Sequence, residues 1–377
     1  MLPAPLSLNR SNYLVTCLLS PYLNLYQASN LLTGLCLLAE QGRIRLRFKS
    51  FLEGSKDSTG DPLTIRLNVQ VATTGVSRTI IVDLYDRSDR FTIAPLEECD
   101  WYFKRSYHTP DVNELPTALR QKVRPFGLNY ACRSTSSTMY ILAKLAPNYG
   151  LRLLRSLSQG ISQFQADIHR LQVRGFLRSP KIQHFEKLPT ATFEPSVLFQ
   201  TRLWAADEVG PGENWEEVNE SRISIIRALR RAFHNRFVGG VQPTAFAMKY
   251  FRDLVTNQPD GRGQYIMWSK RHLIGIYTRG LHHSYAFKLA EYLASSKCIV
   301  SAPLRNTLPV PLVAGKHYIE FSSPEHCVEQ CQQIFRDHEL ASSLQEQAWQ
   351  YYQEQVAPAA QAASFLKSSI EDFRKAT

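Results

Sequence analysis

The chain has 377 residues, which exceeds the size at which a single hydrophobic core normally stops growing, so two domains are expected. Its 44% hydrophobic and 20% charged residues exclude an intrinsically disordered chain. The 44 Lys and Arg residues exceed the 33 Asp and Glu residues and give a formal charge of +11. This excess favours acidic partners, which include nucleotide diphosphates, anionic lipid surfaces and nucleic acid.

Several functional classes lack their sequence signatures. There is no zinc-finger or RNA-recognition module, so nucleic acid is not an expected partner. There is no Gly-rich dinucleotide fingerprint, Walker loop or H-E-x-x-H motif. No apolar run is long enough to span a bilayer, and only Arg10 precedes a short apolar stretch broken by Pro21, so we expect a cytoplasmic protein. The seven scattered Cys residues, without a CxxC pair, are typical of reduced thiols.

One cluster of basic residues interrupts an otherwise even distribution of charge. On a helix, the aliphatic residues between its members would face a core, and the arginines would line an exposed side. That side is either a solvated face or a peripheral contact with an anionic membrane or an acidic acceptor. The cluster consists of Arg227, Arg230, Arg231 and Arg236.

The first half of the chain alternates segments of strand and helix character, which predicts a parallel sheet. It opens with a buried strand at 13–19, and a leucine-rich helix follows over 24–40. A short helical segment precedes the last of the strand candidates. The further strand candidates are 44–48, 63–71, 79–85 and 99–104, and the run 122–130 ends this part of the chain.

The segment over about 149–187 is rich in Arg, Gln and Leu, and we interpret it as a helical insertion. A second sheet then opens with a strand at 196–201. From Pro324 the tail is helical, with a break at Pro358. Between 201 and Pro324, strands are predicted at 236–239 and 273–277, and helices at 219–234, 245–254 and 284–296. A short buried strand, a Pro-rich loop and a last strand follow the helix at 284–296.

The loop after the strand at 273–277 has the features of an anion-binding corner. In an open α/β sheet, ligands bind at the carboxyl ends of the strands. Arg279 supplies a positive charge in this loop, and Gly280 allows close backbone approach. His282 or His283 could donate a hydrogen bond there, and the next helix offers unpaired N–H groups to a phosphate. The sequence therefore predicts an anionic ligand at this loop.

The segment that follows resembles the C-terminal half of glycosyltransferases of the GT-B fold. The comparable run, AEYLASSKCIVS, extends from Ala290 to Ser301 and places a Glu on the helix before a buried strand. The resemblance implies an α/β protein with two Rossmann-like domains that face each other across a cleft. It is clearest from Pro195 to Phe321, and in the N-terminal half it concerns architecture only. The implied parts are an acceptor domain over 1–194, a nucleotide-sugar-binding domain over 195–340, and helices over 341–377 that pack back on the first domain.

The resemblance also implies a set of donor-binding residues. Glu291 would accept hydrogen bonds from the ribose hydroxyls of a nucleotide sugar, and N–H groups near Ser284 and Tyr285 would hold its diphosphate. Retaining members often carry E-x7-E, but His283 stands at the first of these positions, so retaining and inverting chemistry both stay open. An alternative for Glu291 is a surface ion pair with Lys288. The full predicted donor set is Arg202, Arg279, Gly280, His283, Ser284, Tyr285, Lys288 and Glu291.

Arg202 follows the first strand of the second sheet, within the run FQTRLW. A guanidinium at the carboxyl end of a strand suits a diphosphate leaving group, because fixed positive charge stabilises the negative charge that develops as the glycosidic bond breaks. The resemblance supports this role, since GT-B enzymes commonly carry a basic residue after this strand. The alternative is an ion pair with Asp207 or Glu208.

The N-terminal half offers candidates for catalysis and acceptor binding. Asp83 or Asp86 could be the general base of an inverting transfer, although Asp is also common in turns and caps. His108 could exchange a proton near neutral pH or be a bystander. The predicted catalytic residues are Asp86 and His108, and the predicted acceptor-binding residues are Asn24, Gln27, Lys104 and Arg105.

Together these features predict a glycosyltransferase that moves a sugar from a nucleotide sugar to a saccharide, lipid or protein acceptor. The nucleotide sugar is a substrate, and no cofactor is expected. Metal independence follows from the resemblance alone, and the sequence has no Asp-x-Asp motif. Two alternatives stay open: a nucleotide-sugar epimerase of the same fold, and a GT-B-like binding or scaffold protein without turnover, which the missing first Glu favours.

Overall fold

The structure of the protein is a computed structural model that describes residues 13–20, 23–50, 61–144, 173–210, 212–259 and 261–371. The chain divides into two units. Unit 1 comprises Met1–Ile182, Thr307–Pro309 and Gln355–Thr377, and unit 2 comprises Gln183–Asn306 and Val310–Glu354. The main division between these units falls after residue 182, and the predicted domain bounds stay predictions. The predicted insertion over 149–187 lies largely outside the described residues. The predicted cleft stays a prediction.

Unit 1 contains a six-stranded sheet in the order β2-β1-β3-β4-β5-β6. β1 pairs in parallel with β2, and β5 pairs in parallel with β4 and β6, but β3 runs antiparallel to both of its neighbours. The expectation of a parallel sheet is therefore wrong for β3. The strands are β1 (Tyr13–Leu19), β2 (Arg45–Ser50), β3 (Thr64–Val71), β4 (Ser77–Asp83), β5 (Trp101–Lys104) and β6 (Val123–Pro125).

A tight turn explains the reversal at β3. This strand ends at Val71 and β4 begins at Ser77, a connection far too short for the crossover that joins parallel strands. The Val71 N–H donates to the Val76 carbonyl at 2.9 Å, and the Gly75 N–H donates to the Val71 carbonyl at 2.9 Å. Gly75 has a φ of +71°, which a residue without Cβ adopts at little cost. The two strands therefore form a hairpin.

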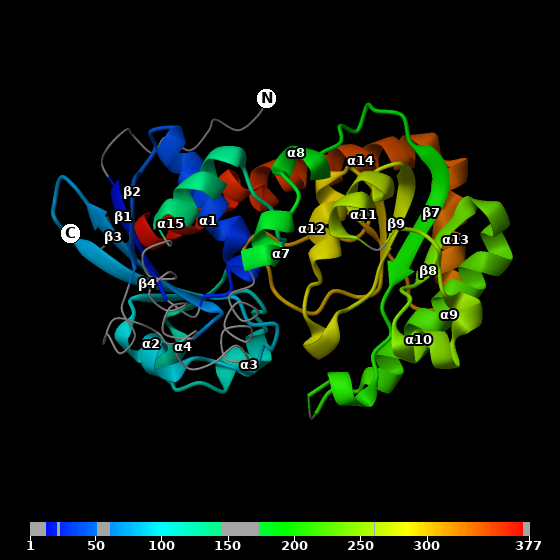
Figure 1. The fold of residues 1–377 in the computed structure, drawn as a ribbon, viewed down its shortest axis with the longest axis horizontal. Coiled ribbons are helices and arrows are strands. Elements are labelled where there is room, and N and C mark those ends of the chain that lie inside the picture. The colour runs from blue at the N-terminus through cyan, green and yellow to red at the C-terminus, as the bar shows by residue number, and fades with distance from the viewer. Residues whose placement is uncertain are drawn as a thin grey trace, which may run out of the picture. The chain divides into compact units, whose positions relative to one another are not determined.

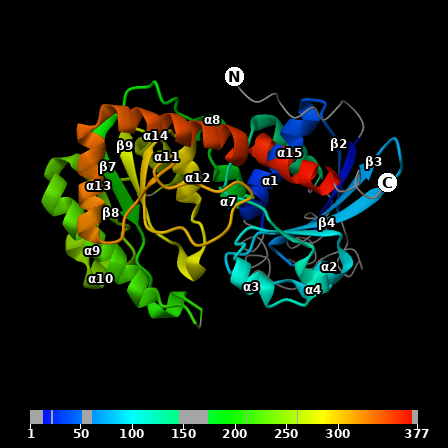
Figure 2. The same ribbon diagram turned by 180° about the vertical axis from the view of Figure 1, so that it is seen from behind.

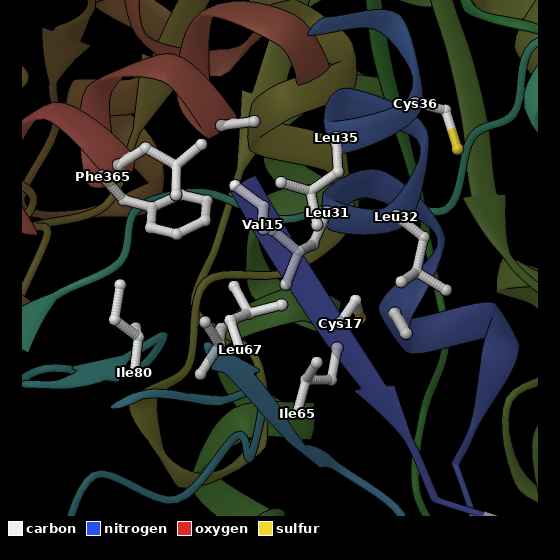
Figure 3. Packing of buried hydrophobic residues seen from close by; sticks show 14 of the residues in the cluster. Val15, Cys17, Leu31, Leu32, Leu35, Cys36, Ile65, Leu67, Ile80 and Phe365 are labelled. Atoms are coloured by element: carbon white, nitrogen blue, oxygen red, sulfur yellow. The ribbon is translucent and has the colours of Figure 1, made fainter. Parts of the chain in front are cut away.

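One face of the unit 1 sheet packs against α1 and α15 (Figure 3). Val15 and Ile80 from the strands are buried together with Leu31 and Leu35 of α1 and Phe365 of α15. A smaller cluster covers the other face with residues of α2, α3 and α4. The helices are α1 (Leu25–Glu40), α2 (Ile93–Glu98), α3 (Thr109–Asn113), α4 (Thr117–Arg120), one over 135–144, α7 (Val173–Arg178) and α15 (Pro358–Glu371), with α8 (Ile182–Phe185) at the division between the units.

α15 returns from the far end of the chain and packs along α1 (Figures 1 and 2). Within this contact, the Asn30 amide donates to Gln361 Oε1 at 2.7 Å. Gly34 lets the two helices approach closely, because a Cβ at this position would overlap the Pro358 carbonyl oxygen and lie 3.0 Å from the Ala362 Cβ. The contact therefore requires a residue without a side chain.

Gly34→Ala is expected to destabilise unit 1 by about 1–3 kcal/mol, because overpacking a tight contact costs more than the ~1 kcal/mol that Ala gains over Gly in a helix. Gly263→Ala in α11 (Arg262–Ser269) is the matched control, since no atom lies within 4 Å of its added Cβ. The control should be neutral or stabilising in urea unfolding. Unchanged or raised stability of Gly34→Ala would contradict the close approach of α1 and α15.

Unit 2 contains a fully parallel, five-stranded sheet in the order β11-β10-β9-β7-β8. The chain passes from β7 to β8 on one side and then to β9 on the other side of β7. The strand order therefore reverses between β7 and β9, which is where open α/β sheets bind ligands. The strands are β7 (Glu194–Thr201), β8 (Phe237–Val241), β9 (His272–Tyr277), β10 (Cys298–Ser301) and β11 (Ile319–Glu320).

Helices pack on both faces of the unit 2 sheet. Ile274 and Ile276 of β9 share a buried cluster with residues of α9 and α13, which lie side by side in Figures 1 and 2. Gly275 faces the opposite side, where a Cβ would meet the Tyr292 ring of α12. The α-helices are α9 (Trp215–Phe233), α10 (Ala245–Tyr250), α11, α12 (Phe287–Ala294), α13 (Pro324–Arg336) and α14 (His338–Tyr351), with short turns of 3-10 helix at Ala206–Glu208, His234–Arg236, Arg252–Leu254 and Leu281–His283 and a π-helical turn at Tyr352–Val356.

Candidate functional site

The loop that follows β9 turns sharply before α12 begins. It contains a single turn of 3-10 helix, in which His282 and His283 have left-handed backbone conformations with φ of +54° and +55°. Such conformations are uncommon for residues with side chains and mark a constrained backbone. The Gly280 N–H donates to the Ser284 carbonyl at 3.0 Å and closes the loop. We call residues 278–286 the β9 corner.

The helix expected over 284–296 is shorter in the structure and begins after an extended segment. Residues Ser284 and Ala286 have extended backbone conformations, and α12 starts only after them. The Ser284 N–H donates to the Leu281 carbonyl at 3.1 Å, and the Ala286 N–H donates to the Tyr277 hydroxyl at 2.9 Å. The backbone groups predicted to hold a diphosphate near Ser284 thus precede the helix, and that of Ser284 is already bonded.

Glu213, in the loop between β7 and α9, binds to the β9 corner. Its side chain is 4% exposed, and Arg279 Nη1 donates to Glu213 Oε1 at 2.9 Å. The His282 N–H donates to Glu213 Oε2, and His282 Nδ1 lies 3.1 Å from the same oxygen. Burial opposes ionisation of this carboxyl, but the hydrogen bonds from Arg279 and His282 outweigh burial and lower the pKa of Glu213. The carboxylate is therefore ionised at neutral pH.

Arg222 of α9 joins the residues that follow β7 and β9. Its Nη1 donates to the Arg202 carbonyl at 2.7 Å, and its Nη2 donates to the Arg279 carbonyl at 2.9 Å. Burial lowers the pKa of Arg222 to about 10, so the guanidinium stays charged at neutral pH. A buried cation thus fixes both loops at the point where the strand order reverses.

Glu291 is buried on α12, with 3% of its side chain exposed, so it is not a surface residue. Its ion-pair partner is Arg262 at the start of α11, whose Nη2 lies 2.5 Å from Glu291 Oε1, and not Lys288. Neither carboxylate oxygen has a well-aligned hydrogen bond to a described residue. An enclosed carboxylate with unused acceptor capacity suits a ligand that brings hydroxyl donors.

Lys288 lies one turn before Glu291 and is half-buried. Its ammonium donates to the Gln200 carbonyl, near the carboxyl end of β7. Burial lowers the pKa of Lys288 to about 8, although the charge of Glu291 acts in the opposite direction. The ammonium is therefore mainly charged at pH 7 and loses its proton as the pH rises above 8.

Arg202, which follows β7, forms one of the two ion pairs weighed from the sequence. Its Nη2 donates to Glu208 Oε1, and its Cζ lies 4.4 Å from the centre of the Trp204 ring. Glu208 Oε2 also accepts the Ala205 N–H at 3.1 Å, and this hydrogen bond and the Arg202 charge lower the pKa of Glu208. A diphosphate would therefore compete with an ionised Glu208 for the Arg202 guanidinium.

The structure corrects the acceptor role expected of Lys104. The side chains of Lys104 and Asp83 are fully buried, and Lys104 Nζ donates to Asp83 Oδ2 at 2.9 Å. The Tyr102 hydroxyl donates to the same oxygen at 2.5 Å, and Asp83 Oδ1 accepts the Tyr85 N–H at 2.8 Å. Because these groups are enclosed and bonded to one another, Lys104 cannot contact an acceptor and Asp83 cannot be the general base. They form a buried ion pair of unit 1.

Asp86, Arg105 and His108 lie beyond the carboxyl ends of β4 and β5. Arg105 is buried, and its Nη1 lies 2.5 Å from Oδ1 of Asp86, whose side chain is 50% exposed. His108 Nδ1 lies 3.0 Å from Oδ1 of Asp111 in α3. Both predicted catalytic residues thus have a charged neighbour beyond the carboxyl ends of these two strands. Their catalytic roles stay predictions.

Asn24 and Gln27 lie at the start of α1. Asn24 is the N-cap of this helix, and its side chain accepts the Gln27 N–H at 3.1 Å. Gln27 Oε1 and Asn129 Oδ1 are buried and have no hydrogen-bond partner among the described residues. The Asn129 amide donates to the Gln27 carbonyl at 2.9 Å, which brings these two residues together. Gln27 and Asn129, rather than Asn24, therefore offer unused acceptors.

The arginines on and after α9 do not form one free basic face. Arg230 and Arg236 donate to backbone carbonyls of neighbouring segments at 2.5 to 3.1 Å. Arg227 and Arg231 are exposed. Two of the four cations thus stabilise unit 2 itself, and the expected contact with an anionic membrane stays a prediction.

Three residues of the unit 2 edge were not singled out from the sequence: Glu213, Arg222 and Arg262. Arg222 had a signal, because it continues the buried stripe of Asn219 and Ile223 at helical spacing on α9. Glu213 and Arg262 had none, since both follow glycine-containing loops without a periodic pattern. Their importance depends on contacts with residues far along the chain, which periodicity does not reveal.

No known protein-family model matches the chain, and no curated protein sequence matches it significantly. Solved structures do match. A glycosyltransferase from Rickettsia africae matches with a TM-score of 0.38 and 9% identity, over 96% of this chain and 98% of that chain. The C-terminal domain of a group 1 glycosyl transferase from Francisella tularensis matches with a TM-score of 0.34 and 9% identity, over 46% of this chain and 96% of that chain.

A UDP-GlcNAc 2-epimerase from Neisseria meningitidis, bound to UDP-GlcNAc, also matches, with a TM-score of 0.35 and 15% identity. That match covers 74% of this chain and 63% of the epimerase chain. Glycosyltransferases, including a group 1 C-terminal domain, are thus among the structures that this chain matches.

Two features are absent from the residues that the structure describes, which are 13–20, 23–50, 61–144, 173–210, 212–259 and 261–371. In those ranges, no helix has the length and apolar character needed to cross a bilayer. In the same ranges, no three His, Cys, Asp or Glu side chains gather as a metal site would require.

Proposed function

We propose that the carboxyl edge of the unit 2 sheet binds the nucleotide part of a nucleotide sugar, and that the protein is a glycosyltransferase. The observation that carries this proposal is the enclosed carboxylate of Glu291 with unused acceptor capacity, placed beside the cations of Arg262 and Lys288. Vicinal ribose hydroxyls are donors that such a carboxylate accepts, and phosphates are anions that such cations bind. One edge thus offers complementary groups for both halves of a nucleoside diphosphate.

Within this proposal, Glu291 binds the ribose hydroxyls, and Lys288 and Arg279 face the diphosphate. Their positive charges stabilise the negative charge that develops on the departing nucleoside diphosphate. Arg222 fixes the backbone of the β9 corner and does not itself contact the ligand. The sugar passes to an acceptor hydroxyl, whose proton is taken by a base; Asp86 and His108 of unit 1 are the candidates for this base.

The charge of Lys288 makes a prediction about pH. The pKa of Lys288 is about 8, so its ammonium is present below pH 8 and is lost as the pH rises through 8. A bound diphosphate raises that pKa, so affinity is expected to fall by up to about tenfold between pH 7.5 and 9.5. Nucleotide phosphates are already fully ionised in this range because their second pKa is about 6. Calorimetric titration of the diphosphate at several pH values measures the slope.

Lys288→Met is the control for this pH dependence. The variant should bind more weakly at pH 7.5 and should lose the decline between pH 7.5 and 9.5, because the titrating group is gone. A decline of the same size in Lys288→Met would assign the titration to another group and remove Lys288 from the diphosphate site.

The proposed function is tested by binding and by turnover. UDP, GDP, ADP and their sugar conjugates are screened for thermal stabilisation of the full chain, and the nucleotide sugar that binds is then incubated with the protein and followed by NMR. Release of the nucleoside diphosphate, by transfer or by slow hydrolysis, supports a glycosyltransferase. Appearance of the C2 epimer would instead identify an epimerase, and binding without any change of the nucleotide sugar would identify a binding protein. Stabilisation by none of these compounds would contradict a nucleotide site.

A further inference from the structure

The groups of the β9 corner that best suit an anion already hold one. The Arg279 guanidinium, the His282 N–H and the His282 imidazole converge on the carboxylate of Glu213, which is almost completely enclosed. A guanidinium fork, a backbone N–H and an imidazole are the donors that proteins use to bind phosphate. The Glu213 carboxylate therefore stands where a phosphate oxygen of the ligand would stand.

We propose that Glu213 is an internal competitor for the anion site of the β9 corner, and that it must leave this site before the diphosphate of the donor binds. The inference rests on the proposed function for the identity of the ligand, and the chemistry of the site requires only a small anion with several oxygens. A carboxylate and a phosphate cannot occupy the same donors, because the two negative charges would repel each other and each needs the same hydrogen bonds.

Glu213 lies in the loop after Gly210 and Gly212, and no atom lies within 4 Å of a Cβ added to either glycine. Gly212 has a φ of +86°. A glycine at such a φ changes conformation at little steric cost, because it has no Cβ. By contrast, the backbone of Arg279 is held by the buried guanidinium of Arg222. The donors are thus held by a buried residue, whereas Glu213 directly follows a glycine whose added Cβ would meet no atom within 4 Å.

A second carboxylate near Arg279 provides a matched control. Glu217 Oε1 lies 3.7 Å from Arg279 Nη2, and the Glu217 side chain is 65% exposed. It carries the same charge near the same guanidinium but does not enclose the donors of the corner. Removing the Glu217 charge changes the local potential without emptying the site, so it separates the competitor role from a general effect of charge.

The experiment titrates inorganic pyrophosphate into the full chain by calorimetry. Glu213→Gln keeps the size of the side chain and removes its charge, and Glu213→Ala empties the site. Both variants are expected to bind pyrophosphate about tenfold more tightly than wild type. This factor corresponds to a wild-type protein in which the Glu213 carboxylate is out of the anion site about one-tenth of the time. Glu217→Gln should bind as wild type does, and Arg279→Ala should bind at least about tenfold more weakly. Circular dichroism and thermal unfolding establish that each variant is folded. If Glu213→Ala does not fold, the affinity of Glu213→Gln alone tests the proposal.

The sign of the change separates the two roles open to Glu213. If Glu213 only positions Arg279 and His282, its substitution loosens these donors and weakens pyrophosphate binding. That result would overturn the proposal that Glu213 competes with the ligand. Equal binding by Glu213→Gln and wild type would overturn it as well, and in both cases the loss seen in Arg279→Ala would leave the proposed nucleotide site standing. Conversely, tighter pyrophosphate binding by Glu213→Gln without binding of any nucleotide would support the competitor role of Glu213 and reject the proposed function. Absence of pyrophosphate binding in every variant would overturn the anion site itself.

Discussion

Asp83→Asn is expected to destabilise unit 1 by about 3–5 kcal/mol, the largest effect of any single substitution considered for this protein. The side chains of Asp83 and Lys104 are fully buried, so the variant would leave the Lys104 ammonium enclosed without a counter-charge. The Tyr102 hydroxyl would also lose its charged acceptor, which it now reaches at 2.5 Å. Urea unfolding, followed by circular dichroism, measures the loss against wild type.

Two further variants make this result specific. Asp89→Asn removes an exposed carboxylate that pairs with Arg87 at 2.6 Å, and it should change stability by less than about 1 kcal/mol. The double variant Asp83→Asn with Lys104→Met removes both buried charges and should recover much of the loss, because the unpaired ammonium is the main cost. A loss of less than about 1 kcal/mol for Asp83→Asn alone would show that the pair is not buried as described.

Glu291→Gln is expected to weaken binding of the nucleoside diphosphate by about 1–3 kcal/mol, which is about 5- to 150-fold in affinity. Glutamine keeps the shape of the side chain but provides one neutral carbonyl oxygen in place of a carboxylate, so two charge-assisted hydrogen bonds from the ribose become weaker. Calorimetric titration of the free nucleoside diphosphate, without an acceptor, measures this loss directly.

The competing explanation for Glu291 is that its carboxylate only neutralises Arg262. Arg262→Met then separates the two explanations. If the pair is purely structural, Glu291→Gln and Arg262→Met should both destabilise the protein and leave its affinity for the nucleotide unchanged. Glu329→Gln, on the exposed surface of α13, is the matched control for loss of one negative charge from unit 2. Equal affinity in wild type and Glu291→Gln would remove the carboxylate from the nucleotide site.

Strand positions were the part of the fold most accessible to sequence reasoning. The strand predicted at 13–19 has these bounds in the structure, because a short apolar run with β-branched residues leaves few alternatives. The direction of β3 was not accessible in the same way. Parallel and antiparallel strands have similar residue patterns, and only the short turn around Gly75 determines that β3 and β4 form a hairpin.

In the candidate site, too, residues marked by a local sequence pattern were accessible to prediction, and contacts between distant segments were not. Arg279 and Lys288 were proposed from the sequence because they lie on the loop and helix that follow a recognisable strand, and Glu291 was proposed from the resemblance to GT-B glycosyltransferases; their roles stay predictions. The burial of Lys104 was missed because its partner, Asp83, lies on the neighbouring strand in register, and a single sequence does not state that register. Glu213 was missed for a similar reason, since its contact with Arg279 spans 66 residues.

The start of α12 was also placed incorrectly for a physical reason. Tyr285, Leu289 and Leu293 have helical spacing, which suggested a helix from 284. In the structure the Ala286 N–H donates to the Tyr277 hydroxyl, and the backbone stays extended up to that residue. A hydrogen bond to the preceding strand thus replaces the first helical turn, and periodicity alone does not contain that information.

The central claim is that a nucleoside diphosphate binds at the β9 corner of unit 2. Hydrogen exchange with mass spectrometry tests it most directly, by comparing backbone amide exchange with and without the nucleoside diphosphate that stabilises the protein. Slower exchange is expected in peptides that cover residues 278–294, while peptides from α13 on the opposite face of the sheet should exchange at unchanged rates. Binding accompanied by protection elsewhere, with no change over residues 278–294, would contradict the account.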